Sequence, residues 1–225
     1  MTKKILISTG GSGGHVVPAT IFYEHLKKDF KVYITSDKRG AQFINKENYR
    51  VKIIDTPKLS NNLFLLPFKF FLIIYLVINS FFFLKKKKID ILISTGGYMS
   101  LPISIASKIL NIKIFLFEPN MVLGRANKLF LNLSEKIFCY SKTIKNFPNK
   151  FSAKIVLINT LLRKEFYLAK TTEDINKVIN LLIIGGSQGA KLFDTKVKNT
   201  IIKLSKKYKL KVFQQTNFKN YEKLK

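Results

Sequence analysis

Two positions in this chain combine a side chain that can move protons with a turn that follows a predicted strand. His15 comes directly after the glycine-rich run Gly10–Gly14, and a neutral imidazole there can accept a proton near pH 7. Glu118 and Asn120 lie in the sequence Phe-Glu-Pro-Asn, where a carboxylate and an amide can bind sugar hydroxyls or act as acid and base. Each has a structural alternative, His15 as a capping or packing residue and Glu-Pro-Asn as an ordinary turn.

The chain has three glycine-rich turns of this kind. The heptapeptide Ile-Leu-Ile-Ser-Thr-Gly-Gly occurs at 5–11 and again at 91–97, and a related run at 181–189 ends in Gly-Gly-Ser-Gln-Gly. An apolar run that stops at paired glycines indicates a buried strand and a tight turn, and a helix that follows directs unpaired N–H groups at an anionic or polar ligand. Val16 breaks the dinucleotide fingerprint, and Lys191 comes one place too late for a P-loop. The glycines therefore predict neither a nicotinamide cofactor nor ATP.

The elements that must position these turns alternate between strand and helix. The predicted strands are short, continuous apolar runs, which is typical of a parallel sheet covered on both faces. They occupy 4–8, 31–34, 51–54, 90–94, 113–117, 136–140 and 154–158. Helices are predicted at 17–28, 63–84, 101–110 and 125–132. This order predicts a doubly wound, Rossmann-like α/β domain over residues 1–163.

The polar stretch 164–177 is predicted to be a linker, after which the alternation restarts. A strand at 178–184, the turn Gly185–Gly189, a helix at 190–207 and a strand at 210–214 follow. Two strands and one helix are too little for a self-sufficient core. We therefore expect residues 178–225 to be an incomplete second domain, either because the chain is truncated or because another chain completes it.

The amino-acid composition limits the kinds of molecule that the chain is expected to bind. The hydrophobic content of 47% allows a buried core, and the single cysteine excludes an intramolecular disulfide framework. The formal charge of +27 suggests an anionic partner (nucleic acid, acidic lipid headgroups or a phosphorylated substrate) or a lysine bias spread over a solvated surface. Only four of the 40 basic residues are arginine. Because base readout depends heavily on arginine, we expect no nucleic-acid partner.

One segment, Leu63–Leu84, is apolar almost throughout and is followed by the four lysines Lys85–Lys88. Its length reaches the ~20 residues that a membrane-spanning helix needs. Pro67 and Lys69 interrupt its first turns, however, and the segment must join two strands of one sheet. We therefore favour a crossover helix whose outer side lies in the interfacial layer of an acidic membrane, and keep a true span and a contact with a partner protein as alternatives.

Four blocks of sequence together resemble the MurG family, the membrane-associated N-acetylglucosaminyltransferases of peptidoglycan synthesis. In chain order they are Gly10–Ala19, Ser94–Pro102, Phe117–Lys128 and Gly185–Lys191. The resemblance implies a GT-B fold, in which two Rossmann-like domains face each other across a cleft. It also implies that the amino-terminal domain receives the lipid acceptor on the cytoplasmic face of the inner membrane, with Leu63–Lys88 as the contact to the acidic membrane surface.

The implied reaction is the transfer of GlcNAc from UDP-GlcNAc to the C4 hydroxyl of undecaprenyl-pyrophosphoryl-MurNAc-pentapeptide, which converts lipid I to lipid II with inversion and requires no metal or other cofactor. By the same resemblance, His15 is the base that deprotonates this hydroxyl, and Glu118 supports it or binds the acceptor. The other implied substrate-binding residues are Ser12, Gly13 and Gly14 near the donor's sugar and diphosphate, Asn120 at the sugar, and Arg163 and Ser187 at the diphosphate. The strands expected to contact the uracil and ribose lie outside the 225 residues, so we expect negligible transfer by these residues alone.

Overall fold

The computed structural model describes residues 2–45, 47–49, 51–56, 66–168, 178–185, 193–216 and 221. The chain forms two compact units, residues 1–164 and residues 165–225, and each is described by itself.

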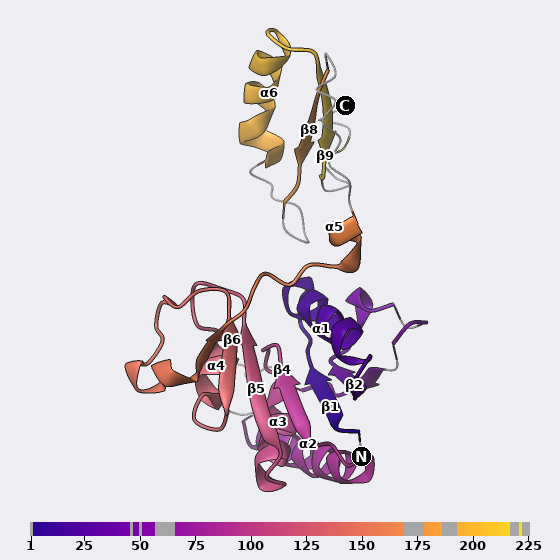
Figure 1. Cartoon of the computed structure of the whole chain (residues 1–225), viewed down its shortest axis with the longest axis vertical. Coiled ribbons are helices and arrows are strands. Elements are labelled where there is room, and N and C mark those ends of the chain that lie inside the picture. The colour runs from indigo at the N-terminus through magenta and orange to yellow at the C-terminus, as the bar shows by residue number, and fades with distance from the viewer. Residues whose placement is uncertain are drawn as a thin grey trace. The chain divides into compact units, whose positions relative to one another are not determined.

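The first unit is built on a seven-stranded, wholly parallel sheet in the order β3-β2-β1-β4-β5-β6-β7 (Figure 1). The strands are β1 (Lys4–Ser8), β2 (Lys31–Ser36), β3 (Val51–Ile53), β4 (Ile91–Ser94), β5 (Lys113–Glu118), β6 (Lys136–Cys139) and β7 (Ile155–Leu157). Their apolar runs are continuous because helices cover both faces of the sheet.

The helical elements of this unit connect successive strands. They are α1 (Gly13–Leu26), η1 (Gly40–Phe43), α2 (Leu66–Lys87), α3 (Ser100–Ile109), α4 (Arg125–Phe130) and η3 (Asn149–Lys154). Leu6 and Leu92 face a core shared with α2, α3 and α4, whereas Ile7 and Ile93 face a second core shared with α1. This alternation follows from the two-residue period of a strand, which sends successive side chains to opposite faces.

The chain order of the strands reverses between β1 and β4. From β1 the sheet grows through β2 and β3 in one direction and through β4 to β7 in the other. The chain segments that follow β1 and β4 therefore lead to helices on opposite faces of the sheet, α1 on one and α3 on the other. In open α/β sheets this reversal is where ligands bind.

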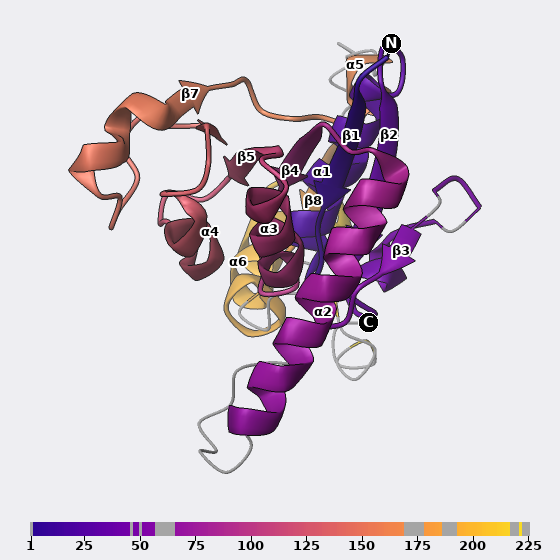
Figure 2. The ribbon, with the colours of Figure 1, turned by 90° about the horizontal axis from the view of Figure 1, so that it is seen from below.

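Helix α2 is a crossover helix that connects β3 to β4 within one sheet. Its Leu84 and Ser80 are buried, and it packs along α3, beyond which its amino-terminal half extends (Figure 2). It is also the one helix in the described part of the chain that is long and apolar enough to cross a membrane, with only 11% of the candidate segment Phe68–Lys87 buried. Since β3 and β4 share a sheet, the fold favours the crossover interpretation of this segment over a span.

The second unit contains a single parallel strand pair. Strand β8 (Ile179–Ile183) pairs with β9 (Leu210–Gln214), and η4 (Phe193–Val197) with α6 (Lys198–Ser205) lies between them in the chain. A further short helix, α5 (Lys164–Leu168), occupies the start of the stretch that was expected to be a linker.

Candidate functional site

The carboxyl ends of β1 and β4 are joined through the side chain of His15. Helix α1 begins at Gly13 with Ser12 as its N-cap residue, so His15 is the third helical residue. Its Nδ1 lies 2.6 Å from the backbone oxygen of Thr95, which directly follows β4. The contact therefore crosses the point where the strand order reverses, which is where open α/β sheets bind their ligands.

This contact fixes the tautomer of the imidazole. A carbonyl oxygen can only accept a hydrogen bond, so Nδ1 of His15 must carry the proton. In the neutral ring Nε2 then keeps its lone pair and can accept a proton. Thr95 is itself held in place, because its buried hydroxyl donates to Thr9 at 2.8 Å. The geometry is that of an oriented general base.

Gly96 provides the space that the imidazole occupies. A Cβ atom at Gly96 would lie 3.1 Å from Cε1 and 3.3 Å from Nδ1 of His15, so a side chain there would require the ring to shift by a few tenths of an ångström. The backbone φ of Gly96 is +95°, which also favours glycine. Gly97 has a similar φ of +91°, but a Cβ atom there would make only ordinary contacts of 3.7 Å or more.

The start of α1 presents backbone donors beside His15. The N–H groups of Gly13 and Gly14 belong to the first helical turn, where no carbonyl of the helix itself can pair with them. Packing requires glycine at neither position. A Cβ atom at Gly13 would come no closer than 3.6 Å to Phe43, and one at Gly14 no closer than 3.7 Å to Ser12. Each nevertheless costs about 1 kcal/mol of helix stability relative to alanine. Close approach of an anionic ligand to bare backbone would explain both glycines.

A buried carboxylate, Asp37, holds the turn after β1 in place. Its Oδ1 accepts hydrogen bonds from the backbone N–H groups of Gly11 at 2.8 Å and Gly40 at 2.7 Å. Its Oδ2 lies 3.5 Å from Nε of Arg39. Asp37 is 5% exposed, so this one side chain ties the turn after β2 to the glycine-rich turn after β1.

Glu118 at the end of β5 is occupied by its own loop. Its Oε1 accepts from the backbone and side-chain nitrogens of Asn120 at 3.2 and 2.9 Å, and its Oε2 accepts from the backbone N–H of Gly124 at 2.7 Å and from Nδ2 of Asn127 at 2.9 Å. It is 2% exposed. The carboxylate therefore shapes the loop that carries Asn120, and the exposed Asn120 keeps its amide oxygen available as an acceptor.

The remaining predicted site residues are Arg163 and Ser187. Arg163 is exposed at the end of the first unit, where the backbone N–H of Leu161 donates to the Tyr140 hydroxyl at 3.1 Å. Burial, followed by the effect of Glu24, raises the pKa of Tyr49 to about 12, and the nearby charge of Arg163 acts in the opposite direction. Ser187 lies outside the described residues.

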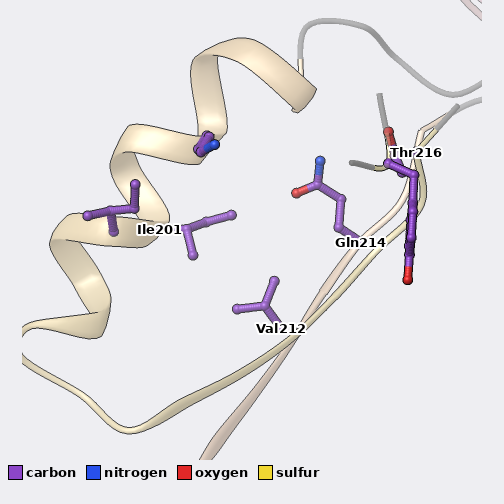
Figure 3. Close-up of a pocket in the computed structure, with 7 residues that line it drawn as sticks. Ile201, Val212, Gln214 and Thr216 are labelled. Atoms are coloured by element: carbon purple, nitrogen blue, oxygen red, sulfur yellow. The ribbon is translucent and has the colours of Figure 1, made fainter. Parts of the chain in front are cut away.

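The second unit has a pocket of about 350 Å³ between α6 and β9. Ile201 of α6 and Val212 of β9 project into it, and Gln214 and Thr216 line its strand side (Figure 3). Among the residues that the structure describes, none of those predicted to bind substrate lines this pocket.

The outer side of α2 carries a stripe of exposed apolar side chains with spacings of three and four residues. We call Phe68, Phe71, Tyr75, Ile78 and Phe82 the α2 stripe. Its members are between 51% and 70% exposed, and the exposed lysines Lys85–Lys88 follow it at the end of the helix. An apolar stripe that ends in cations suits the boundary between lipid headgroups and acyl chains.

Comparison with known protein families assigns the first unit to one of them. The N-terminal domain of glycosyltransferase family 28 matches residues 5–139, which include β1 to β6, His15 and Glu118. The chain belongs to glycosyltransferase family 28. This assignment agrees with the resemblance to the MurG family that the four sequence blocks indicated.

Several family 28 relatives carry one name, UDP-N-acetylglucosamine--N-acetylmuramyl-(pentapeptide) pyrophosphoryl-undecaprenol N-acetylglucosamine transferase. The protein of that name from Pelagibacter ubique is 59% identical over 225 residues, which are 100% of this chain and 63% of the relative. The protein of that name from a Wolbachia of Brugia malayi is 34% identical over 98% of this chain and 62% of its own length. The chain thus spans less than two thirds of the length of these curated relatives.

Solved structures confirm the fold class. The crystal structure of Acinetobacter baumannii MurG matches 99% of this chain and 63% of its own with a TM-score of 0.72 at 23% identity. UDP-GlcNAc 2-epimerase from Neisseria meningitidis matches with a TM-score of 0.62 at 15% identity. These likenesses, together with the parallel seven-stranded sheet, establish the predicted α/β fold of the GT-B type.

Two residues of the family 28 unit were missed by reasoning from the sequence. Thr95 belongs to the repeated heptapeptide at 91–97 and was assigned no role, although its backbone carbonyl orients His15. Asp37 was not among the predicted site residues, although it fixes the glycine-rich turn. The signal for Asp37 was its place just past a strand neighbouring β1, where the carboxyl ends of parallel strands meet at one edge of the sheet.

Proposed function

We propose that this chain is the acceptor-binding part of an enzyme that transfers GlcNAc from UDP-GlcNAc to the C4 hydroxyl of undecaprenyl-pyrophosphoryl-MurNAc-pentapeptide, converting lipid I to lipid II. Membership of family 28 and the shared name of the relatives support this reaction. The observation that carries the proposal is the orientation of His15, whose Nε2 is left as a proton acceptor where the strand order reverses.

In the proposed reaction Nε2 of His15 takes the proton of the C4 hydroxyl as that oxygen attacks the anomeric carbon of GlcNAc. The bond between this carbon and the diphosphate oxygen of the donor breaks, and its electron pair leaves with UDP. Attack from the side opposite the leaving group inverts the anomeric configuration. Backbone donors at a helix start, such as those of Gly13 and Gly14, are suited to stabilise a diphosphate charge.

Glu118 has a positioning role in this proposal. Its four hydrogen bonds stabilise the loop from Asn120 to Gly124 and Asn127, and they leave the amide oxygen of Asn120 to accept from a sugar hydroxyl. Arg163 and Ser187 remain predicted contacts to the diphosphate.

The α2 stripe is the proposed membrane contact. A lipid-linked acceptor is confined to the bilayer, so an enzyme that uses it benefits from docking on the same surface. The stripe would lie at the boundary between headgroups and acyl chains, while Lys85–Lys88 meet acidic headgroups. We therefore propose a peripheral location on the cytoplasmic face of the inner membrane, where a nucleotide-sugar donor is available.

Membrane docking can be measured by co-sedimentation with phosphatidylglycerol vesicles. Burial of one exposed aromatic side chain contributes about 2 kcal/mol, so the double variant Phe71→Ser with Phe82→Ser is expected to bind at least ~10-fold more weakly. The matched control replaces Phe166 and Leu168, which are as exposed but lie on α5, by serine. Equal losses in both double variants would show that the α2 stripe is not the contact.

The reaction is tested with isotope-labelled UDP-GlcNAc. The assay compares the 225-residue chain with a chimera in which these residues are joined to the part of the Pelagibacter ubique relative outside the match. The chimera is expected to label lipid I and to leave a water-soluble acceptor such as free N-acetylmuramic acid unlabelled. Labelling of another lipid-linked acceptor but not of lipid I would contradict the proposed substrate.

A further inference from the structure

Arg39 stands beside the glycine-rich turn after β1 without having been assigned a role. A Cβ atom built on Gly11 would lie 4.0 Å from Nη2 of Arg39. The guanidinium therefore borders the same stretch of backbone that leads into the donors of Gly13 and Gly14. Its side chain is 58% exposed, so the terminal nitrogens can reach a ligand.

The position of Arg39 is fixed by the backbone on one side and by a carboxylate on the other. Gly40, the next residue, packs so closely on the glycine-rich turn that a Cβ atom there would lie 2.5 Å from Cα of Gly10. Asp37 binds the N–H groups of both turns through Oδ1 and faces Nε of Arg39 through Oδ2 at 3.5 Å. The turn after β2 thus holds Arg39 beside the glycine-rich turn after β1.

Lys38, the cationic residue next to Arg39 in the chain, has different surroundings. Nζ of Lys38 lies 3.6 Å from Asp55, and its side chain is 78% exposed. Arg39 faces Asp37 through Nε, and the two terminal nitrogens of its exposed side chain form a planar donor pair suited to phosphate. The first turn of α1 contains no acidic residue that would compete for these donors.

We infer that Arg39 is a diphosphate-binding residue at the Gly10–Gly14 turn and that Asp37 positions it. The inference rests on the proposed function for its ligand, a pyrophosphate group carried either by the nucleotide-sugar donor or by the lipid acceptor. Arg39 supplies two charge-assisted hydrogen bonds to phosphate oxygens, and the α1 start supplies backbone N–H groups.

Isothermal titration calorimetry of the 225-residue chain with inorganic pyrophosphate tests this role. Arg39→Ala is expected to weaken binding by roughly 10-fold or more, and Arg39→Lys by less, because lysine keeps the charge but not the planar pair. Lys38→Ala removes the same charge one residue away and is expected to change the affinity by less than about 3-fold. Thermal unfolding of each variant identifies any loss that reflects misfolding; Arg39→Lys keeps a cation beside Asp37 and serves if Arg39→Ala does not fold.

Two further ligands distinguish the source of the diphosphate. A selective loss with UDP-GlcNAc assigns Arg39 to the donor, and a selective loss with farnesyl diphosphate assigns it to the acceptor. Equal weakening by Lys38→Ala and Arg39→Ala, an unchanged affinity in Arg39→Ala, or no pyrophosphate binding by the parent chain would each overturn the inference. Because binding requires no sugar transfer, a chain that binds through Arg39 but whose chimera makes no lipid II would refute the proposed function alone.

Discussion

The glycines after β4 allow the orientation of His15 to be disturbed selectively. Gly96→Ala places a Cβ atom 3.1 Å from Cε1 and 3.3 Å from Nδ1 of the imidazole, whereas Gly97→Ala makes no contact shorter than 3.7 Å. Both residues have φ values above +90°. The two alanine variants therefore share the strain of a left-handed alanine backbone, but only Gly96→Ala also crowds the imidazole.

The magnitudes follow from these contacts. A left-handed conformation costs a non-glycine residue about 1–2 kcal/mol, and alanine regains about 0.4–1 kcal/mol by restricting the unfolded chain. Gly97→Ala should therefore lower the free energy of unfolding by about 1 kcal/mol. Gly96→Ala should also shift the imidazole by a few tenths of an ångström and weaken its hydrogen bond to Thr95, which is worth about 1 kcal/mol, and so cost up to about 2 kcal/mol.

Nitrogen NMR of the imidazoles provides the decisive readout. The chain has two histidines, and the exposed His25 serves as an internal reference for His15. The parent chain and Gly97→Ala should keep the proton of neutral His15 on Nδ1, while Gly96→Ala should shift His15 toward a mixture of tautomers. Equal stability of the two variants together with an unchanged His15 spectrum would refute the account of how this residue is oriented.

Three further predictions concern other parts of the first unit. Gly14→Ala should raise the free energy of unfolding by up to about 1 kcal/mol and yet weaken pyrophosphate binding, and a stabilised variant with full binding would contradict ligand approach at this position. Glu118→Gln should cost about 2–3 kcal/mol in urea unfolding, because an amide nitrogen would face donors that now bind carboxylate oxygens, whereas Glu135→Gln at an exposed position should cost less than about 0.5 kcal/mol. Burial, followed by the charge of Glu118, raises the pKa of the Cys139 thiol from 9.0 to about 11, so the folded chain holds this proton more tightly than the unfolded chain. Stability should therefore fall by about 1–3 kcal/mol as the pH rises from 9 to about 11, and the corresponding loss in Cys139→Ala should be smaller.

The sheet could be predicted in detail because its strands are buried on both faces. Continuous apolar runs bounded by polar residues mark where such strands begin and end, and the predicted range 4–8 is the observed extent of β1. The start of α1 was predicted four residues too late, at 17. Two glycines with low helix propensity obscured a helix that begins at Gly13 behind the N-cap residue Ser12.

The site was predictable by position but not by contact. Residues that follow parallel strands meet at one edge of a sheet, and this brought His15, Glu118 and Asn120 to the carboxyl end of the sheet. The partner of His15 lies 80 residues away and is a backbone oxygen, which no side-chain pattern reveals. Glu118 was expected to support the base or bind the acceptor, and its hydrogen bonds with its own loop became visible only once the chain was folded.

The measurement that tests the central claim most directly is single-turnover transfer from labelled UDP-GlcNAc to lipid I by the chimera, with His15→Ala compared with His25→Ala. His25 lies on the same helix and is exposed at its last turn, so it controls for the loss of an imidazole. If His15 is the base, His15→Ala should slow the chemical step by about 10²–10⁴-fold while His25→Ala leaves it unchanged. Equal rates in the two variants would contradict the account.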